Sequence, residues 1–228
     1  MREGKVGAII VAAGQSKRMQ GIDKIFAQLA GKPLLARVVE VFQECEVVDQ
    51  MVIVLSRQNL ELGKELAAKN HWTKVKAICL GGERRQDSVR EGLKRLANCR
   101  WVIVHDGARP LLTRELIEKG LAEAQESGAA IAAVPVKETI KRVSPEGFVQ
   151  ETPRRDNLWI AQTPQVFDFD LLVRAHEQIN EEVSDDAMLV EKLGHKVKLY
   201  LGSYENIKVT TPEDLALAEF ILNRKETK

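Results

Sequence analysis

The sequence has little of what marks several large classes of protein. Its 228 residues include only three cysteines, and none of them is spaced as a CxxC pair. An odd number of cysteines in apolar stretches favours free thiols in a reducing compartment over a disulfide framework. No apolar run approaches the roughly 18 to 20 residues that a membrane-spanning helix needs, so we expect no membrane partner.

An excess of charge of one sign is also missing. Lys and Arg together number 34 against 33 for Asp and Glu, which leaves a formal net charge of +1. Nucleic-acid-binding domains usually carry a basic excess, so we expect no nucleic-acid partner. The first residues lead directly into a strand-like run and lack the pattern of a signal peptide. Together these absences favour a cytoplasmic enzyme.

The chain has instead a regular alternation of short β-branched runs and longer amphipathic segments. Strands are expected at residues 6–12, 51–55, 75–80, 101–105, 129–136 and 197–201, and helices at 33–44, 59–69, 86–97, 114–127, 168–181 and 212–224. The last helix has a clear start, with Thr211 as N-cap and Pro212 in its first turn. This alternation predicts an α/β fold: a Rossmann-like, mostly parallel sheet with helices on both faces.

Residues 137–159 break the alternation. They show no helical period and carry a Ser144-Pro145-Glu146-Gly147 turn between two strand-like flanks. The pattern predicts a β-hairpin arm that projects from a single domain covering residues 1–228. Such an arm is a plausible surface for exchange in a homodimer, and a surface loop without a role is the alternative.

The loop after the first expected strand has the composition of an anion-binding site. Ligands of open α/β sheets bind beyond the carboxyl ends of the strands, and free backbone N–H groups there cradle phosphates. The small and basic residues of this region are Ala12, Ala13, Gly14, Lys17, Arg18 and Lys24. Neither GxGxxG nor GxxxxGK[ST] is present, which excludes the dinucleotide fingerprint and the P-loop. Tight packing of the strand against its loop is the alternative explanation.

Further motifs follow along the chain. AAGQSKRM at 12–19 is followed by GGERRQDSV at 81–89, HDGARP at 105–110, PVKETIK at 135–141, QTPQ at 162–165 and NIKVT at 206–210. In this order the set resembles the nucleotidyltransferases that activate sugars and polyols, and among them the 2-C-methyl-D-erythritol 4-phosphate cytidylyltransferase family. Ribitol 5-phosphate cytidylyltransferases share much of the pattern and remain an alternative, as does a nucleotide-binding module without turnover.

The resemblance implies a reaction of CTP with 2-C-methyl-D-erythritol 4-phosphate, in the non-mevalonate route to isoprenoids. The products would be 4-diphosphocytidyl-2-C-methyl-D-erythritol and pyrophosphate. A phosphate monoester is mostly dianionic at pH 7, because its second pKa is about 6, so the nucleophile needs no general base. Catalysis then consists of positioning and of neutralising two polyanions. Mg²⁺ bound with CTP is the implied cofactor, and a homodimer formed through the arm is the implied assembly.

The resemblance also assigns roles to individual residues. Arg18 and Lys24 would stabilise charge on the α-phosphate and the leaving pyrophosphate. Arg155 and Lys208 would position the polyol phosphate, with Arg155 reaching a neighbouring subunit and Arg154 as its alternative. Other ligand contacts are expected from Ala12, Ala13, Gly14, Gly81, Gly82, Ser88, Asp106, Ala108, Arg109, Thr139 and Thr163, with Ser184 as a further candidate. Asp106 is also the candidate metal ligand, directly or through water.

Some of these residues also have simpler explanations. Ser88 could serve only the start of its helix, a role that we expect for Asp87. Asp106 and Arg109 could form a buried structural pair.

The histidines and the paired aspartates carry weaker signals. His105 has no metal partner nearby in the sequence and is expected to be structural, whereas His71, His176 and His195 are expected to be solvated. Asp185 and Asp186 lie outside a strand and therefore fit the DxD motif of glycosyltransferases poorly.

Overall fold

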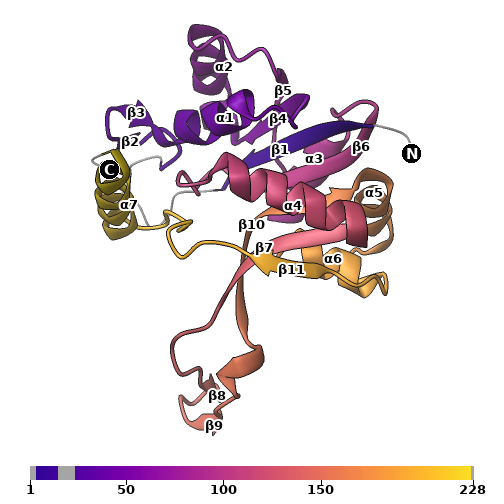
Figure 1. The fold of residues 1–228 in the computed structure, drawn as a ribbon, viewed down its shortest axis with the longest axis vertical. Helices are drawn as coiled ribbons and strands as arrows, with labels where there is room; N and C mark the ends of the chain where they lie inside the picture. Colours follow the sequence, from indigo (N-terminus) through magenta and orange to yellow (C-terminus); the bar gives the residue numbers. More distant parts are fainter. Residues whose placement is uncertain (1–3, 15–23, 227–228) are drawn as a thin grey trace.

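The computed structural model describes residues 4–14 and 24–226, which build a central sheet of seven strands. From edge to edge the strand order is β11-β7-β10-β6-β1-β4-β5 (Figure 1). The strands are β1 (Lys5–Ala12), β4 (Gln50–Leu55), β5 (Val75–Leu80), β6 (Cys99–Asp106), β7 (Ala129–Pro135), β10 (Trp159–Asp168) and β11 (Lys198–Leu201). Within this sheet all neighbours pair in parallel except at β10, which runs antiparallel to β6 and β7. The predicted mostly parallel sheet is confirmed.

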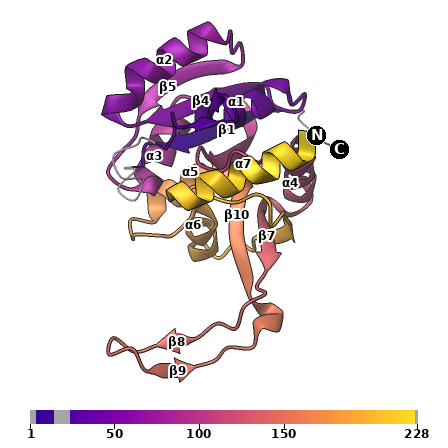
Figure 2. The same ribbon diagram turned by 90° about the vertical axis from the view of Figure 1, so that its left-hand side faces the viewer.

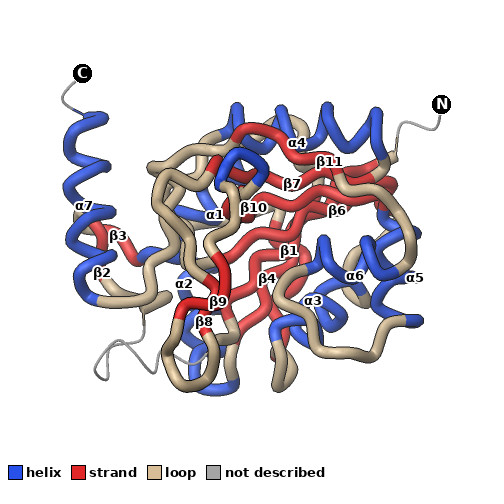
Figure 3. The backbone as a smooth tube through the Cα atoms, turned by 90° about the horizontal axis from the view of Figure 1, so that it is seen from below, coloured by secondary structure: helices blue, strands red, loops and turns tan. Residues whose placement is uncertain are grey.

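Helices cover both faces of the sheet, also as predicted. They are α1 (Leu34–Glu44), α2 (Leu60–Lys69), α3 (Arg85–Leu93), α4 (Arg114–Ser127), α5 (Phe169–Gln178), α6 (Asp186–Lys192) and α7 (Pro212–Glu226), with 3-10 turns η1 (Arg57–Asn59) and η2 (Arg155–Asn157). Helices α1, α4 and α7 contribute to one buried cluster, and α3, α5 and α6 to a second on the other face (Figure 3). Side chains alternate across each strand, so Ile10 of β1 joins the first cluster and Ile9 the second.

The predicted start of the last helix is confirmed. The Asp214 backbone N–H donates to Thr211 Oγ1 over 3.3 Å, and the Thr211 N–H donates to Asp214 Oδ2 over 2.9 Å. This reciprocal pair satisfies two backbone donors that a helix end would otherwise leave without partners. None of the helices among the described residues is both long and apolar enough to cross a lipid bilayer.

Strand β10 and helix α6 were not predicted from the sequence. The middle of β10 is polar and contains a proline, features that normally argue against a central strand. The structure accommodates them with a register shift between Ala161 and Gln165. The amide nitrogens of the buried glutamines find acceptors there: Gln162 Nε2 donates to the Ser203 carbonyl oxygen over 2.8 Å, and Gln165 Nε2 donates to Asp185 Oδ2 over 2.8 Å. Helix α6 has only seven residues, too few to show a clear period.

The β-hairpin arm lies where the sequence predicted it. Strands β8 (Arg142–Val143) and β9 (Val149–Glu151) pair antiparallel, and the arm projects away from the sheet between β7 and β10 (Figures 1 and 2). Its Phe148 side chain is 74% exposed and Val149 is 58% exposed, so the arm leaves apolar surface in contact with solvent. At the root of the arm, Tyr204 donates to the Pro135 carbonyl oxygen over 2.7 Å.

The two tyrosines of the chain provide a matched test of how the sheet is held. The hydroxyl of buried Tyr200 in β11 lies 3.1 Å from the carbonyl oxygen of Pro164 and 3.3 Å from that of Leu116. Tyr200→Phe should lower the free energy of unfolding by about 1 to 2 kcal/mol, because it removes a buried hydrogen bond. Tyr204→Phe should cost less than about 0.5 kcal/mol, since water replaces the lost bond at the surface. Equal costs in urea unfolding would contradict this difference.

Candidate active site

The carboxyl ends of β1, β5 and β6 meet at one edge of the sheet, and a cavity opens there. The loop after β1, the turn after β5 and the end of β6 all contribute to its wall. The residues that line this first cavity are Val11, Ala12, Ala13, Gly14, Lys24, Ile25, Gly82, Glu83, Arg84, Arg85, Ser88, Asp106, Ala108 and Lys208. The structure therefore brings most of the predicted ligand contacts from the first, second, third and last motifs into one wall.

The glycine turn after β5 holds two of these loops close together. A Cβ atom at Gly81 would lie 2.4 Å from Ala13 Cβ and 2.5 Å from Ser88 Oγ, so only glycine fits between them. The Gly82 N–H donates to Ser88 Oγ over 3.2 Å. Ser88 thus shapes the turn besides lining the first cavity. Asp87 caps the start of α3, as expected, by accepting from the Arg84 N–H over 3.2 Å.

Asp106 is a buried carboxylate that contacts three cationic side chains among the described residues. Lys208 Nζ lies 2.8 Å from its Oδ2, Arg109 Nε lies 3.6 Å from its Oδ2, and Arg85 Nε lies 3.2 Å from its Oδ1. Burial alone would raise the pKa of Asp106, but the charges of Arg85, Lys208 and Arg109 outweigh it and hold this pKa far below its usual range. Asp106 is therefore ionised at neutral pH and paired with these three cations.

His105 and Thr163 fix the backbone on which Asp106 stands. The Asp106 N–H donates to Thr163 Oγ1 over 3.0 Å, and Thr163 Oγ1 lies 3.0 Å from His105 Nδ1. His105 Nε2 lies 3.2 Å from the Arg109 carbonyl oxygen, which can only accept, so Nε2 carries the proton and Nδ1 accepts from Thr163. Burial lowers the pKa of His105 to about 4 and keeps the ring neutral. The expected structural role of His105 fits this geometry.

A second cavity lies on the other side of Asp106. It shares Arg85, Asp106 and Lys208 with the first cavity, so these three side chains form the wall between the two. The other residues that line it are Arg109, Ala161, Gln162, Thr163, Gln165, Ser184 and Asp185. Arg109, whose side chain is only 12% exposed, donates from Nη1 to the Asn206 carbonyl oxygen over 2.8 Å. The second cavity thus has cationic groups on one side and hydroxyl and amide groups on the other.

Two hydrogen bonds tie the last motif to the HDGARP motif and to the QTPQ motif. The Val209 N–H donates to the Ala108 carbonyl oxygen over 2.8 Å, and Asn206 Nδ2 donates to the Thr163 carbonyl oxygen over 2.8 Å. These contacts place Lys208 beside Asp106 although the two are far apart in the sequence. The loop before α7 is in this way a fixed part of the site.

Three of the predicted residues are not found with the others. Arg18 lies outside the described residues. Thr139 and Arg155 belong to the exposed arm and line neither cavity, and Arg155 Nη1 donates instead to the Lys137 carbonyl oxygen over 2.8 Å. Its neighbour Arg154 pairs with Asp156 at the surface, 3.0 Å away. These arm residues therefore do not contribute to either cavity of their own chain.

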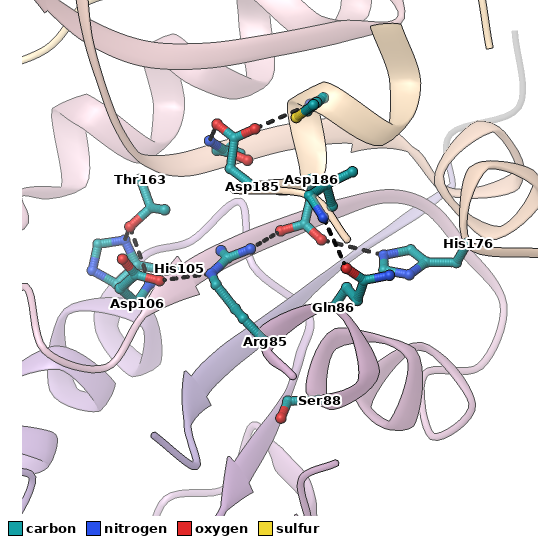
Figure 4. Close-up of polar contacts among 12 residues, drawn as sticks. Arg85, Gln86, Ser88, His105, Asp106, Thr163, His176, Asp185 and Asp186 are labelled. Atoms are coloured by element: carbon teal, nitrogen blue, oxygen red, sulfur yellow. Dashed lines mark hydrogen bonds and ion pairs between the residues drawn. The ribbon is translucent and has the colours of Figure 1, made fainter. Parts of the chain in front are cut away.

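The structure adds a group of residues that the sequence did not single out, shown in Figure 4. Arg85 joins Asp106 to Asp186, and Asp186 joins His176. The expectation that His176 is solvated is wrong, because only 3% of it is exposed. It lies four residues after buried Leu172 on the inward face of α5, a spacing that could have revealed its burial. His71 and His195 are exposed, as expected.

Comparison with known proteins identifies the family. A model of the family described as 2-C-methyl-D-erythritol 4-phosphate cytidylyltransferase matches residues 6–224. The chain belongs to this family. A family member from Dehalococcoides mccartyi (strain CBDB1) is 53% identical over 220 residues, covering 96% of this chain and 97% of that protein. Another from Alkaliphilus oremlandii is 47% identical, covering 97% and 96%.

Solved structures support the same cytidylyltransferase fold. The crystal structure of the 4-diphosphocytidyl-2C-methyl-D-erythritol synthase from Anaerococcus prevotii superposes with a TM-score of 0.85 at 30% identity, covering 96% of each chain. The cytidylyltransferase from Thermus thermophilus gives a TM-score of 0.78 at 31% identity, covering 96% of this chain and 99% of that one. Family membership makes the protein a nucleotidyltransferase and rules out the alternative of a nucleotide-binding module without turnover. It also favours methylerythritol phosphate over ribitol phosphate as the acceptor.

The neutral ring of His105 should make stability depend on pH. Its pKa of about 4 in the folded protein lies below the ordinary value of 6.5, so between these values the unfolded chain binds a proton that the folded protein does not. The contribution of the neutral His105 ring to stability is therefore fully present above pH 6.5 and is lost as the pH drops toward 4. His105→Gln lacks this effect, so the difference in unfolding free energy between wild type and variant should narrow by about 2 kcal/mol from about pH 7 to about pH 5 in urea unfolding. A constant difference would contradict the burial of a neutral ring.

Proposed function

We propose that this chain joins CTP and 2-C-methyl-D-erythritol 4-phosphate across the wall formed by Asp106, Arg85 and Lys208. The observation that carries the proposal is the pair of cavities that share this wall. Two polyanionic substrates must approach one another, and the Lys208 ammonium in this shared wall lets both phosphates meet the same charge. The free thiols of Cys45, Cys79 and Cys99 fit a reaction that takes place in the cytoplasm.

We assign CTP to the first cavity. Ala12 is the last residue of β1, and Ala13 and Gly14 follow it, at an edge of the sheet where backbone N–H groups suit a triphosphate. The turn at Gly81 and Gly82 would read the edge of a cytosine through backbone groups and would exclude a purine by size. Lys24, which lines this cavity, and Arg18 would stabilise charge on the α-phosphate and the leaving pyrophosphate.

We assign the polyol phosphate to the second cavity. Arg109 and Lys208 supply its positive charge, and Thr163 and Ser184 offer hydroxyl groups for the polyol. An oxygen of the substrate phosphate attacks the α-phosphorus of CTP, a new P–O bond forms, and the bond to pyrophosphate breaks in line with it. Because this phosphate is already a dianion, the residues of the site act by holding and neutralising rather than by removing a proton.

A divalent cation fits this site only as a companion of CTP. Among the described residues no group of three His, Cys, Asp or Glu side chains is arranged to hold a metal ion. Mg²⁺ commonly takes one or two carboxylates together with substrate phosphates and waters, and Asp106, which lines the first cavity, would supply one of them directly or through water. The cation would neutralise triphosphate charge when bound.

We further propose that the arm completes the site of a second copy of the chain. Its exposed Phe148 and Val149 supply apolar surface for a homodimer, and Arg155 and Thr139 line neither cavity of their own subunit. In a two-fold dimer the partner's Arg155 and the partner's Thr139 would close the second cavity, where an arginine gives a bidentate grip on phosphate.

Release of pyrophosphate tests the reaction directly. Purified protein with CTP, Mg²⁺ and 2-C-methyl-D-erythritol 4-phosphate should release pyrophosphate rapidly. Ribitol 5-phosphate should be a much poorer acceptor, and ATP, GTP and UTP much poorer donors. Equal rates with ribitol 5-phosphate would contradict the assignment of methylerythritol phosphate as the specific acceptor. Equal rates with all four nucleotides would contradict the proposal that the glycine turn recognises cytosine.

Subunit mixing tests the shared site. Arg155→Ala and Lys24→Ala subunits should each be nearly inactive alone, but a mixed dimer has one site with both residues intact. Random mixing should therefore restore about a quarter of the wild-type activity. As the matched control, mixing Arg155→Ala with the double variant Lys24→Ala/Arg155→Ala should restore none. If mass measurement confirms mixed dimers and no activity returns, the site is not shared.

A further inference from the structure

Arg85 bridges two carboxylates that come from different parts of the chain. It is the first residue of α3, and its Nε lies 3.2 Å from Asp106 Oδ1. Its Nη1 donates to Asp186 Oδ2 over 2.5 Å. Asp186 is fully buried, and only 24% of the Arg85 side chain is exposed. Figure 4 shows the guanidinium between the two carboxylates. Asp106 lines both cavities, and Asp186 lines neither.

The far end of this bridge is itself fixed. His176 Nε2 lies 3.2 Å from Asp186 Oδ1, and since a carboxylate can only accept, the ring donates from Nε2. Both oxygens of Asp186 therefore have a partner. Burial alone would raise the pKa of Asp186, but the Arg85 charge and the bond from His176 outweigh it and lower this pKa, so the group stays ionised.

The loop that carries Asp186 is also tied to α3. Gln86, next to Arg85, donates from Nε2 to the Glu181 carbonyl oxygen over 3.0 Å and accepts at Oε1 from the Val183 N–H over 3.1 Å. Asp185 caps α6 by accepting from the Met188 N–H over 3.0 Å. The chain that leads into Asp186 is thus fixed by its own contacts, and the Asp186 side chain offers Arg85 an anchor.

We infer that Arg85 is a positioning residue: clamped by Asp186 and His176, it sets the direction of the Asp106 carboxylate between the two cavities. Lys208 is 39% exposed and ends in a flexible chain, so it cannot fix that direction by itself. A planar guanidinium donates to two carboxylates from nitrogens held in fixed directions, whereas the ammonium of a lysine is a point charge on a flexible stem and fixes neither direction. The consequence for turnover rests on the proposed function.

The substitution Asp186→Asn tests the clamp without touching either cavity. It keeps the size of the side chain but removes the charge that holds Arg85. We expect kcat to fall by about 10- to 100-fold, because a small misplacement of Asp106 and Lys208 disturbs the approach of the two phosphates. The KM for CTP should change less than about threefold, since the loop after β1 and the glycine turn stay in place.

Asp168→Asn is the matched control. Asp168 also pairs with an arginine, Arg100, at 2.8 Å, and it caps α5 by accepting from the Leu171 N–H over 3.1 Å. It lies at the opposite end of β6 from Asp106 and lines neither cavity. Asparagine caps helices as well as aspartate does. The control should keep kcat within about twofold of the wild type.

A role confined to stability gives a different result. In that case Asp186→Asn would lower the melting temperature but leave the kcat of the folded enzyme unchanged, and the inference would be wrong. If this variant does not fold, Arg85→Lys replaces it: the charge remains but the bridge is lost, so the same fall in kcat is expected and an unchanged kcat would overturn the inference.

Crystal structures of the wild type and Asp186→Asn give a readout that does not need turnover. The Asp106 carboxylate should turn relative to the wild type once Arg85 is released from Asp186. An unchanged orientation would overturn the inference whatever the activity. An inactive wild type with a reoriented Asp106 in the variant would instead contradict the proposed function and leave the clamp supported.

Discussion

The buried charge of Asp106 is the constraint on which the rest of the site depends. A carboxylate this deep in a protein is stable only beside cations, and here they arrive from three separate elements: Arg85 from α3, Arg109 from the loop after β6, and Lys208 from the loop before α7. Each of these cations lowers the cost of burying the Asp106 carboxylate. The carboxylate therefore holds these three elements together, because its negative charge offsets the repulsion among the basic groups.

The antiparallel strand β10 explains how one sheet serves both the site and the arm. It lies between β6 and β7. At its bulged centre Thr163 accepts a hydrogen bond from the Asp106 N–H, and its first residues continue directly from the arm. The arm thus leaves the sheet beside the second cavity, where Ala161 and Gln162 form part of the wall. A parallel strand in this place would need a crossover connection, and the arm would have to start elsewhere.

The sequence predicts those parts of the fold that are regular and apolar. Strands such as β4, buried along its whole length, and helices with a clear period, such as α4, were found to within a few residues. Strand β10 was missed because its polar side chains are satisfied by partners distant in the sequence, which no local pattern shows. For the same reason the motifs located Asp106 and Lys208 but not the clamp. Arg85 and Asp186 are 101 positions apart, and His176 looks like a surface residue until its helix is placed.

The cations around Asp106 are unequally exposed to solvent, and their roles in the site differ accordingly. Arg109 and Arg85 have 12% and 24% of their side chains exposed and are held by further partners, whereas Lys208 is 39% exposed. A rigid cation shapes a site at no cost when the substrate enters, because its orientation was fixed during folding. An exposed lysine can instead turn toward an arriving phosphate while the arginines keep Asp106 paired. The site can therefore accept a second polyanion without leaving its central carboxylate uncompensated.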